Sequence, residues 1–302
     1  MRKILVLVDT IGPNRRRLVR FLNRNSKGEY KAILRKFSDL FFEIKTRKVK
    51  IKAGEDDLAN FDLVFIRRAG KFIRSIGGIV KYLDYKKVEF IDPAYREVGI
   101  SLDKASSAIR LAIKGTPVPD TVFCYKESVS KNKERIVAAL GFPIIAKAVF
   151  SQKNRDIYIL RNLQDFDRLQ KKSKKDFIFQ KFIDIDIEYR LLIMGGEVRV
   201  LEQKYERNYE NLKVGFKKLS GLSIFLDLKT ASPEINNVAL KAAKILGLDI
   251  AGVDLAVEKR TDKNYVIEVN KGPGIISDGR SSPEIKALSD FLIQKIRRVS
   301  DG

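Results

Sequence analysis

The chain has 302 residues, with 60 Lys or Arg against 38 Asp or Glu, which gives a formal net charge of +22. A hydrophobic content of 44% suits a globular protein, and this length leaves room for two or three lobes. The sequence has no His and one Cys, so Ser-His or Cys-His catalysis, imidazole-bound zinc and an internal disulfide are all excluded.

The basic surplus is spread along the chain and would attract polyanions: nucleotides, nucleic acid, an acidic protein tail or an anionic membrane surface. A source proteome that is basic throughout would give the same charge, so the surplus alone identifies no partner. No apolar run reaches 18 residues, and the single Cys124 suits a reducing compartment. We therefore expect a cytoplasmic protein with no membrane partner.

The first predicted elements are a strand, a helix and a second strand. Ile4 to Val8 is a continuous apolar run typical of a buried parallel strand. A helix is expected from about residue 14 to 25, and Leu63 to Ile66 forms the next strand. This order indicates a doubly wound α/β lobe.

Ligands of such a lobe bind at the carboxyl ends of its strands. Asp9, Arg67 and Arg68 follow two of the predicted strands and are therefore candidate ligand-binding residues. The alternative for Arg67 and Arg68 is that they are ordinary members of the basic surplus.

A helix is expected to begin at Ser101, which is a good N-cap residue, and to end at Gly115. Its apolar stripe would consist of Leu102, Ala105, Ile109 and Ala112. Prolines stiffen the segment 116–121 that follows, so we interpret it as a linker. Lys104 on this helix is, by itself, a solvated lysine.

Phe142 to Lys147 predicts an apolar strand that ends in a lysine. A lysine in this position either extends to solvent or binds an anion. We favour the anion, because a lysine is a common phosphate partner.

Three further strands are expected between residues 176 and 202, the last two joined by a tight turn at Gly195-Gly196. Ser232-Pro233 and Ser282-Pro283 each predict the start of a helix, with serine as the N-cap and proline in the first turn.

The strongest chemical signal is a hairpin of two apolar strands, Ile250 to Val257 and Tyr265 to Val269. Glu268 and Asn270 project from the same face of their strand, and Asp254 can meet them from the neighbouring strand. Buried carboxylates need a partner, and oxygen ligands suit Mg²⁺ that bridges substrate phosphates. The alternative is a hairpin whose acids face solvent or pair with lysines.

Asp254-Leu-Ala-Val, then Val-Ile-Glu-Val-Asn270 and the Pro-Gly that follows, resemble the terminal motif of the ATP-grasp superfamily. Within it the chain is most similar to the RimK-like ribosomal-protein glutamate ligases and amino-acid ligases. The resemblance implies an ATP-grasp fold of the α/β class. It divides the chain into a Rossmann-like pre-ATP-grasp domain at 1–100, a central lid subdomain at 101–180 and a carboxyl-terminal subdomain with the metal site at 181–302.

The resemblance also implies roles for individual residues. Asp254, Glu268 and Asn270 would bind two Mg²⁺ ions, for which Mn²⁺ could substitute, and Arg190 and Asn211 would be catalytic. The ATP site would comprise Lys104 and Lys147 at the phosphates, Gln180, Lys181, Phe182 and Ile183 at the adenine, and Glu188 at the ribose.

The family has a glycine-rich phosphate loop where this chain has Phe150-Ser-Gln-Lys-Asn-Arg-Asp156, without glycine. Backbone that lacks glycine cannot readily approach a ligand or take positive φ. Side chains of Ser151, Lys153 and Arg155 would have to replace backbone amides there.

The implied reaction joins a carboxylate to an amine through an acyl phosphate and releases ADP. The partners would be ATP, an amino-acid or amine donor and a carboxylate acceptor, which could be an acidic protein tail or polyglutamate; a homo-oligomer is compatible with this. One alternative is an ATP-grasp scaffold that has lost ligation together with its glycines. The other is a basic nucleic-acid-binding α/β protein, which would leave the hairpin acids unexplained.

Overall fold

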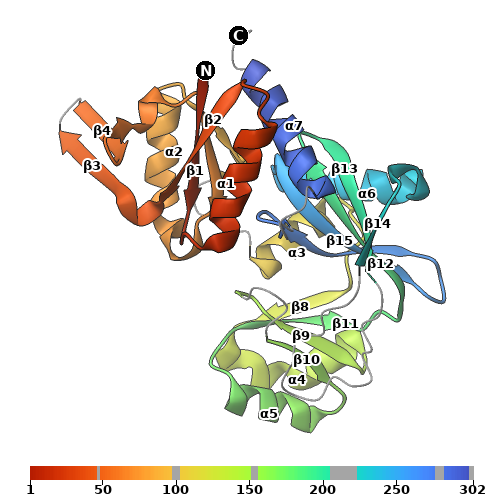
Figure 1. The fold of residues 1–302 in the computed structure, drawn as a ribbon. Helices are drawn as coiled ribbons and strands as arrows, with labels where there is room; N and C mark the ends of the chain where they lie inside the picture. Colours follow the sequence, from red (N-terminus) through yellow and green to blue (C-terminus); the bar gives the residue numbers. More distant parts are fainter. Residues whose placement is uncertain (46–47, 97–102, 151–155, 205–222, 276–281, 299–302) are drawn as a thin grey trace.

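The computed structural model describes residues 1–45, 48–96, 103–150, 156–204, 223–275 and 282–298. The strands of these residues form four sheets, and three lobes are visible in Figure 1. Short 3-10 helices connect some of the elements: Phe37–Asp39, Leu58–Asn60, Gly70–Ser75, Pro93–Arg96 and Leu228–Thr230.

A parallel sheet of order β2-β1-β6-β7 forms the amino-terminal lobe. Its strands are β1 (Arg2–Val8), β2 (Tyr30–Lys36), β6 (Leu63–Arg68) and β7 (Glu89–Ile91). Helix α1 (Pro13–Asn25) packs on one face of the sheet and α2 (Ile76–Tyr85) on the other. Because both faces are covered, residues 4–8 of β1 are at most 1% exposed. The predicted strand, helix and strand are confirmed.

A small antiparallel sheet of β3 (Leu40–Lys45), β4 (Lys48–Ala53) and β5 (Asp56–Asp57) projects from this lobe (Figure 1). Ile51 and Ala53 of β4 are buried in the same core as α2. The sequence analysis predicted no element here.

The N-cap of helix α3 (Lys104–Ile113) lies two residues later than predicted. Asp103 is its N-cap, since its Oδ1 accepts a hydrogen bond from the Ser106 N–H at 2.8 Å. The prediction that Ser101 caps the helix is therefore wrong. The predicted apolar stripe is also wrong in part, because Ala105 and Leu111 are buried whereas Ile109 and Ala112 are exposed.

The central lobe contains an antiparallel sheet of order β10-β9-β11-β8. Its strands are β8 (Thr121–Cys124), β9 (Ile144–Ala148), β10 (Ile157–Leu160) and β11 (Phe177–Lys181). Helices α4 (Lys126–Leu140) and α5 (Leu163–Lys172) cover one face, where alternate residues of β9 and β11 enter their core. The other face is turned toward the carboxyl-terminal sheet (Figure 1).

The third lobe is built on an antiparallel sheet of order β14-β13-β12-β15-β16. Its strands are β12 (Ile185–Met194), β13 (Glu197–Lys204), β14 (Ser223–Leu226), β15 (Ile250–Glu258) and β16 (Asn264–Asn270). The predicted turn between β12 and β13 is confirmed. Gly195 has φ +63° and a Cβ there would lie 2.9 Å from the Phe291 ring, so glycine is required.

Two helices cover this sheet, and both predicted starts are confirmed. Helix α6 (Pro233–Ile245) is capped by Ser232 and packs on one face. Helix α7 (Pro283–Arg298) packs on the other face and also against α1, so the end of the chain completes the core of the amino-terminal lobe (Figure 1). At the same junction, Asp92 Oδ1 accepts a hydrogen bond from the Ile250 N–H at 2.8 Å.

No helix among the described residues combines the length and the apolar character needed to cross a bilayer.

Candidate functional site

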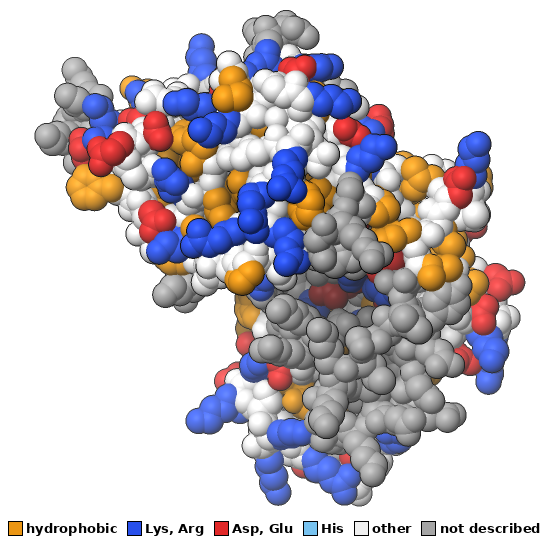
Figure 2. All heavy atoms as spheres, in the orientation of Figure 1, with side chains coloured by type: hydrophobic (Ala, Val, Ile, Leu, Met, Phe, Trp, Pro, Cys, Tyr) orange, Lys and Arg blue, Asp and Glu red, His pale blue; other side chains and the backbone are white. Residues whose placement is uncertain are grey.

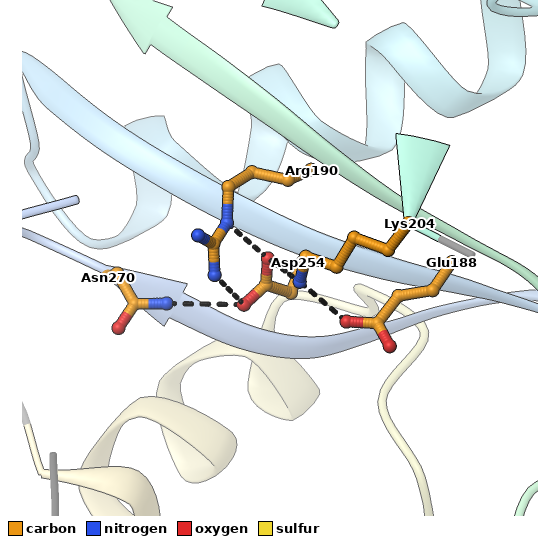
Figure 3. Close-up of polar contacts among 5 residues, drawn as sticks. All are labelled: Glu188, Arg190, Lys204, Asp254 and Asn270. Atoms are coloured by element: carbon orange, nitrogen blue, oxygen red, sulfur yellow. Dashed lines mark hydrogen bonds and ion pairs between the residues drawn. The ribbon is translucent and has the colours of Figure 1, made fainter. Parts of the chain in front are cut away.

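The three predicted metal ligands lie together on the paired strands β15 and β16. Asp254 is directly opposite Glu268 in the strand register, and Asn270 is opposite Gly252 on the same pair. Asn270 Nδ2 donates to Asp254 Oδ2 at 3.3 Å (Figure 3). Asp254 is 3% exposed, so its carboxylate cannot rely on water for neutralisation and needs a partner in the site.

Two cations from the neighbouring strands hold this carboxylate (Figure 3). Arg190 on β12 donates from Nε to Asp254 Oδ1 at 2.7 Å and from Nη2 to Oδ2 at 3.0 Å, which is a bidentate pair. Lys204 at the end of β13 donates to Asp254 Oδ1 at 2.8 Å and to Glu188 Oε1 at 2.6 Å. Lys204 thus connects the predicted metal site to Glu188, the predicted ribose partner.

The cations determine the charge state of the site. Burial alone would raise the pKa of Asp254, but Lys204 and Arg190 hold it at about 2. Burial would likewise lower the pKa of Arg190, and the neighbouring Asp254 more than offsets this and raises it. Both groups are therefore fully ionised at neutral pH.

Lys104, the first residue of α3, reaches the same place from a third direction. Its Nζ lies 3.4 Å from Glu268 Oε1. Three carboxylates and three cations therefore alternate within the site: Glu188, Asp254 and Glu268 with Lys104, Arg190 and Lys204. Carboxylate and amide oxygens are the donors that Mg²⁺ prefers, and Asp254, Glu268 and Asn270 carry such oxygens. In this structure both Asp254 oxygens accept hydrogen bonds, from Arg190, Lys204 and Asn270.

The sequence analysis missed Lys204, and the strand register explains why. Symmetric pairing about the Gly195-Gly196 turn would place Gln203 opposite Glu188. A register shift between Leu192 and Ile193 moves the pairing by one residue and brings Lys204 opposite Glu188. Only the observed pairing reveals this contact.

The central sheet presents the remaining predicted nucleotide residues. Lys147 on β9 and Gln180 on β11 are 9% and 5% exposed, and they lie on the face opposite α4 and α5. The Lys104 N–H contacts Val149 O at 3.5 Å, so the two predicted phosphate lysines lie on adjacent elements.

Gln180 Nε2 donates to Thr121 Oγ1 at 3.0 Å. Gln180 Oε1 is buried and accepts no hydrogen bond from any residue that the structure describes. Lys181 follows it as the last residue of β11, and Phe182 and Ile183 lie in the segment between β11 and β12, which links the central and carboxyl-terminal sheets. Ser151, Lys153, Arg155 and Asn211 lie outside the described residues.

Two of the three predicted ligand residues of the amino-terminal lobe, Asp9 and Arg68, also meet. Asp9 Oδ1 lies 3.0 Å from Arg15 Nη2, and Asp9 Oδ2 lies 3.7 Å from Arg68 Nε. Arg67 Nη2 donates to Pro273 O, three residues beyond Asn270. Burial, together with Arg15 and Arg68, lowers the pKa of Arg67 to about 10. Arg15 was not predicted, because nothing in its sequence context distinguishes it from the arginines around it.

Comparisons with known proteins agree on a family. Residues 101–285 match the RimK-like ATP-grasp domain. A probable alpha-L-glutamate ligase from Syntrophotalea carbinolica is 24% identical over 267 residues, which cover 85% of this chain and 83% of that protein.

Two solved structures share the fold over nearly their full lengths. The ATP-grasp ligase PsnB, complexed with a phosphomimetic variant of a minimal precursor, Mg and ADP, superposes with a TM-score of 0.70 at 16% identity, covering 97% of this chain and 98% of that chain. D-alanyl-alanine synthetase A from Vibrio cholerae gives a TM-score of 0.69 at 14% identity, covering 100% and 99%.

Proposed function

Because the chain belongs to the RimK-like ATP-grasp family, we propose that it is an ADP-forming ligase that joins an amine to a carboxylate. In this reaction a carboxylate oxygen of the acceptor attacks the γ-phosphorus of ATP, and the bond from that phosphorus to the ADP oxygen breaks. The amine nitrogen then attacks the acyl carbon and phosphate leaves. Since the relative from Syntrophotalea carbinolica is named a glutamate ligase, glutamate is the first amine donor to test.

The observation that supports this proposal is the alternation of three buried or half-buried carboxylates with three cations across β12, β13, β15, β16 and α3. Phosphoryl transfer needs little beyond positioned positive charge, so a site without histidine is adequate. Asp254, Glu268 and Asn270 would hold Mg²⁺, which neutralises phosphate oxygens when it is bound.

The cations of the site have separate tasks in this proposal. Lys104 and Lys147 bind the phosphates from α3 and β9, with Lys147 supplied by the lid sheet. Arg190 keeps Asp254 ionised and oriented through its bidentate pair. Lys204 fixes Glu188 beside Asp254, so that the ribose partner and the metal ligand keep a constant separation.

Gln180 adds a binding group to the lid. Its Oε1 is a buried acceptor that lacks a donor among the described residues, and the adenine amino group is a donor. Because this acceptor matches the adenine amino group, we place the purine of ATP at the segment 180–183. Glu188 would then bind the ribose.

The test is ADP release with Mg²⁺, ATP and pooled amino acids, with the ligated product identified by mass. Glu268→Gln should reduce turnover by at least about 100-fold because it removes a carboxylate from the metal and phosphate site. Lys147→Met and Lys104→Met should weaken ATP binding about tenfold or more, as expected for phosphate partners in a partly dry site.

Lys171→Met is the matched control, since Lys171 is an exposed lysine on α5. Equal small losses of ATP affinity in all three lysine variants would mean that Lys104 and Lys147 act only through the overall positive charge and do not contact the phosphates. Tight Mg-ATP binding without ADP release for any amino acid would instead identify a nucleotide-binding scaffold that does not ligate. Full Mg²⁺-dependent ATP consumption by Glu268→Gln would show that the metal site is wrongly placed.

A further inference from the structure

Helix α1 has a charge distribution that its own fold does not explain. It carries five arginines and no acid, and three of them form one exposed stripe: Arg16, Arg20 and Arg24 at intervals of four residues. Figure 2 shows Lys and Arg side chains gathered over α1 on this face of the molecule. Within the part of the chain that the structure describes, no carboxylate pairs with any of the three.

This arrangement disfavours the helix in two ways. Like charges four residues apart repel on a helix surface. Cations near the start of the helix also oppose its macrodipole, and α1 has no acid in its first turn, whereas Arg24 in the last turn is favourably placed. A helix whose sequence served only the core would not need these residues, because Leu18, Val19 and Leu22 make the buried face.

The stripe leads toward the candidate ligation site. Arg15, next to Arg16, lies 3.0 Å from Asp9, and Arg68 shares the same carboxylate at 3.7 Å. Arg67 beside them contacts Pro273, in the loop that follows Asn270. Arg15 and Arg68 therefore share one acid at the carboxyl ends of β1 and β6, and Arg67 adds a third positive charge near them. This excess of positive charge is continuous with α1.

We propose that the face formed by Arg16, Arg20 and Arg24, together with the cluster of Arg15, Arg67 and Arg68, is a binding track for an acidic peptide that serves as the carboxylate acceptor. The peptide lies along α1 and its reacting end passes the cluster toward Asp254 and Glu268. This inference rests on the proposed ligase function, because it assigns the acceptor of that reaction.

The spacing of the arginines along α1 matches the spacing of side chains along an extended peptide. Residues four apart on a helix are separated by about 6 Å along its axis. Side chains on one face of an extended peptide repeat about every 6.8 Å. Three arginines can thus meet three alternate acidic side chains, and the small mismatch lies within the reach of an arginine. A peptide is favoured over a nucleic acid because it brings the carboxylate that a ligase must activate.

The test measures binding without ligation. A fluorescent hexaglutamate peptide with a free carboxyl terminus is titrated at low salt against the full chain, with hexaglutamine and single-stranded hexauridylate as comparison probes. The test variant is Arg16→Gln, Arg20→Gln and Arg24→Gln together. The control variant is Lys131→Gln, Lys171→Gln and Lys174→Gln together, which removes the same charge from exposed positions of the central lobe.

We expect the α1 variant to lose about tenfold in hexaglutamate affinity and the control variant less than about twofold, with no hexaglutamine binding to either. Circular dichroism and Mg-ATP affinity should be unchanged in both variants. Arg15→Gln should raise the KM for an acidic acceptor more than it lowers kcat, because it removes binding rather than chemistry.

Equal losses in the two triple variants would overturn the proposal in favour of bulk charge. Hexauridylate that binds through α1 more tightly than hexaglutamate would assign the track to nucleic acid instead. Failure of the ligase proposal is recognised separately, by absent Mg-ATP binding or by ADP release that survives Glu268→Gln, and neither result depends on the peptide probe.

Discussion

The cluster around Asp254 and the exposed face of α1 use charge in opposite ways. In the first, every carboxylate has a cation from another strand or helix within the chain, and Asp254 is 3% exposed. In the second, three exposed arginines have no acidic partner among the described residues, and Arg15 and Arg68 at their end share the single carboxylate of Asp9. A balanced buried cluster contributes to the fold as well as to the chemistry, whereas an unbalanced exposed face serves something outside the chain.

The largest effect that this comparison predicts is on the buried side. Asp254→Ala would leave Arg190 and Lys204 beside a site that has lost its shared carboxylate. Removal of one partner from a buried ion pair costs about 3 to 5 kcal/mol, so the free energy of unfolding should fall by about that amount. Urea unfolding followed by circular dichroism measures it directly.

The pH dependence gives an independent check. The pKa of Asp254 is lowered in the folded state, so the stability it contributes is present above about pH 4 and is lost as the pH falls toward about 2. Asp254→Ala should lack this part of the acid-induced loss. If Asp254→Ala were as stable as the natural chain and lost stability at low pH in the same way, the cluster around Asp254 would not contribute to the stability of the fold.

A second, intermediate effect concerns salt. Interactions between exposed charges are screened within about 8 Å at physiological ionic strength, whereas buried pairs are screened much less. The kcat/KM for an acidic acceptor should therefore fall by about tenfold or more between low and physiological salt, while the affinity for Mg-ATP changes less. Steady-state rates and ATP titrations at matched salt concentrations measure these two quantities separately. A kcat/KM for the true acceptor that does not change with salt would contradict the assignment of the exposed α1 face to acceptor binding.

Local patterns in the sequence predicted a large part of this architecture. The buried strand β1, the β12–β13 turn at Gly195-Gly196, and the serine caps of α6 and α7 each follow from residues within a few positions of one another. Alternation along β16 correctly placed Glu268 and Asn270 on one face. Asp254 lies opposite Glu268 because of a register shift between Asp254 and Leu255, which alternation alone does not predict.

What escaped prediction depends on contacts between distant residues. Lys204 reaches Glu188 only because a bulge shifts the β12–β13 register by one residue. The start of α3 was misplaced because Ser101 and Asp103 are both acceptable caps by residue type, and the structure shows the Asp103 side chain in that role. Arg68 was visible in the sequence, but its position beside Asp9 depends on the parallel pairing of β1 with β6.

The smallest predicted effect has the opposite sign and bears most directly on the comparison. Replacing Arg16, Arg20 and Arg24 with Gln removes two like-charged pairs at four-residue spacing, while glutamine remains a good helix former. Loss of the unfavourable Arg16 near the start of α1 and of the favourable Arg24 in its last turn have opposite effects on the macrodipole and offset each other. Each repulsive pair costs about 0.2 to 0.5 kcal/mol, so the variant should be more stable than the natural chain by about 0.5 to 1 kcal/mol. The central-lobe triple variant of Lys131, Lys171 and Lys174 should change the free energy of unfolding by less than this, because those residues do not lie on one helix face.

Urea unfolding of the two triple variants, measured as for Asp254→Ala, tests this prediction. A loss of more than about 1 kcal/mol in the α1 variant would mean that these arginines stabilise the fold after all, and the reason for assigning them to a partner would disappear.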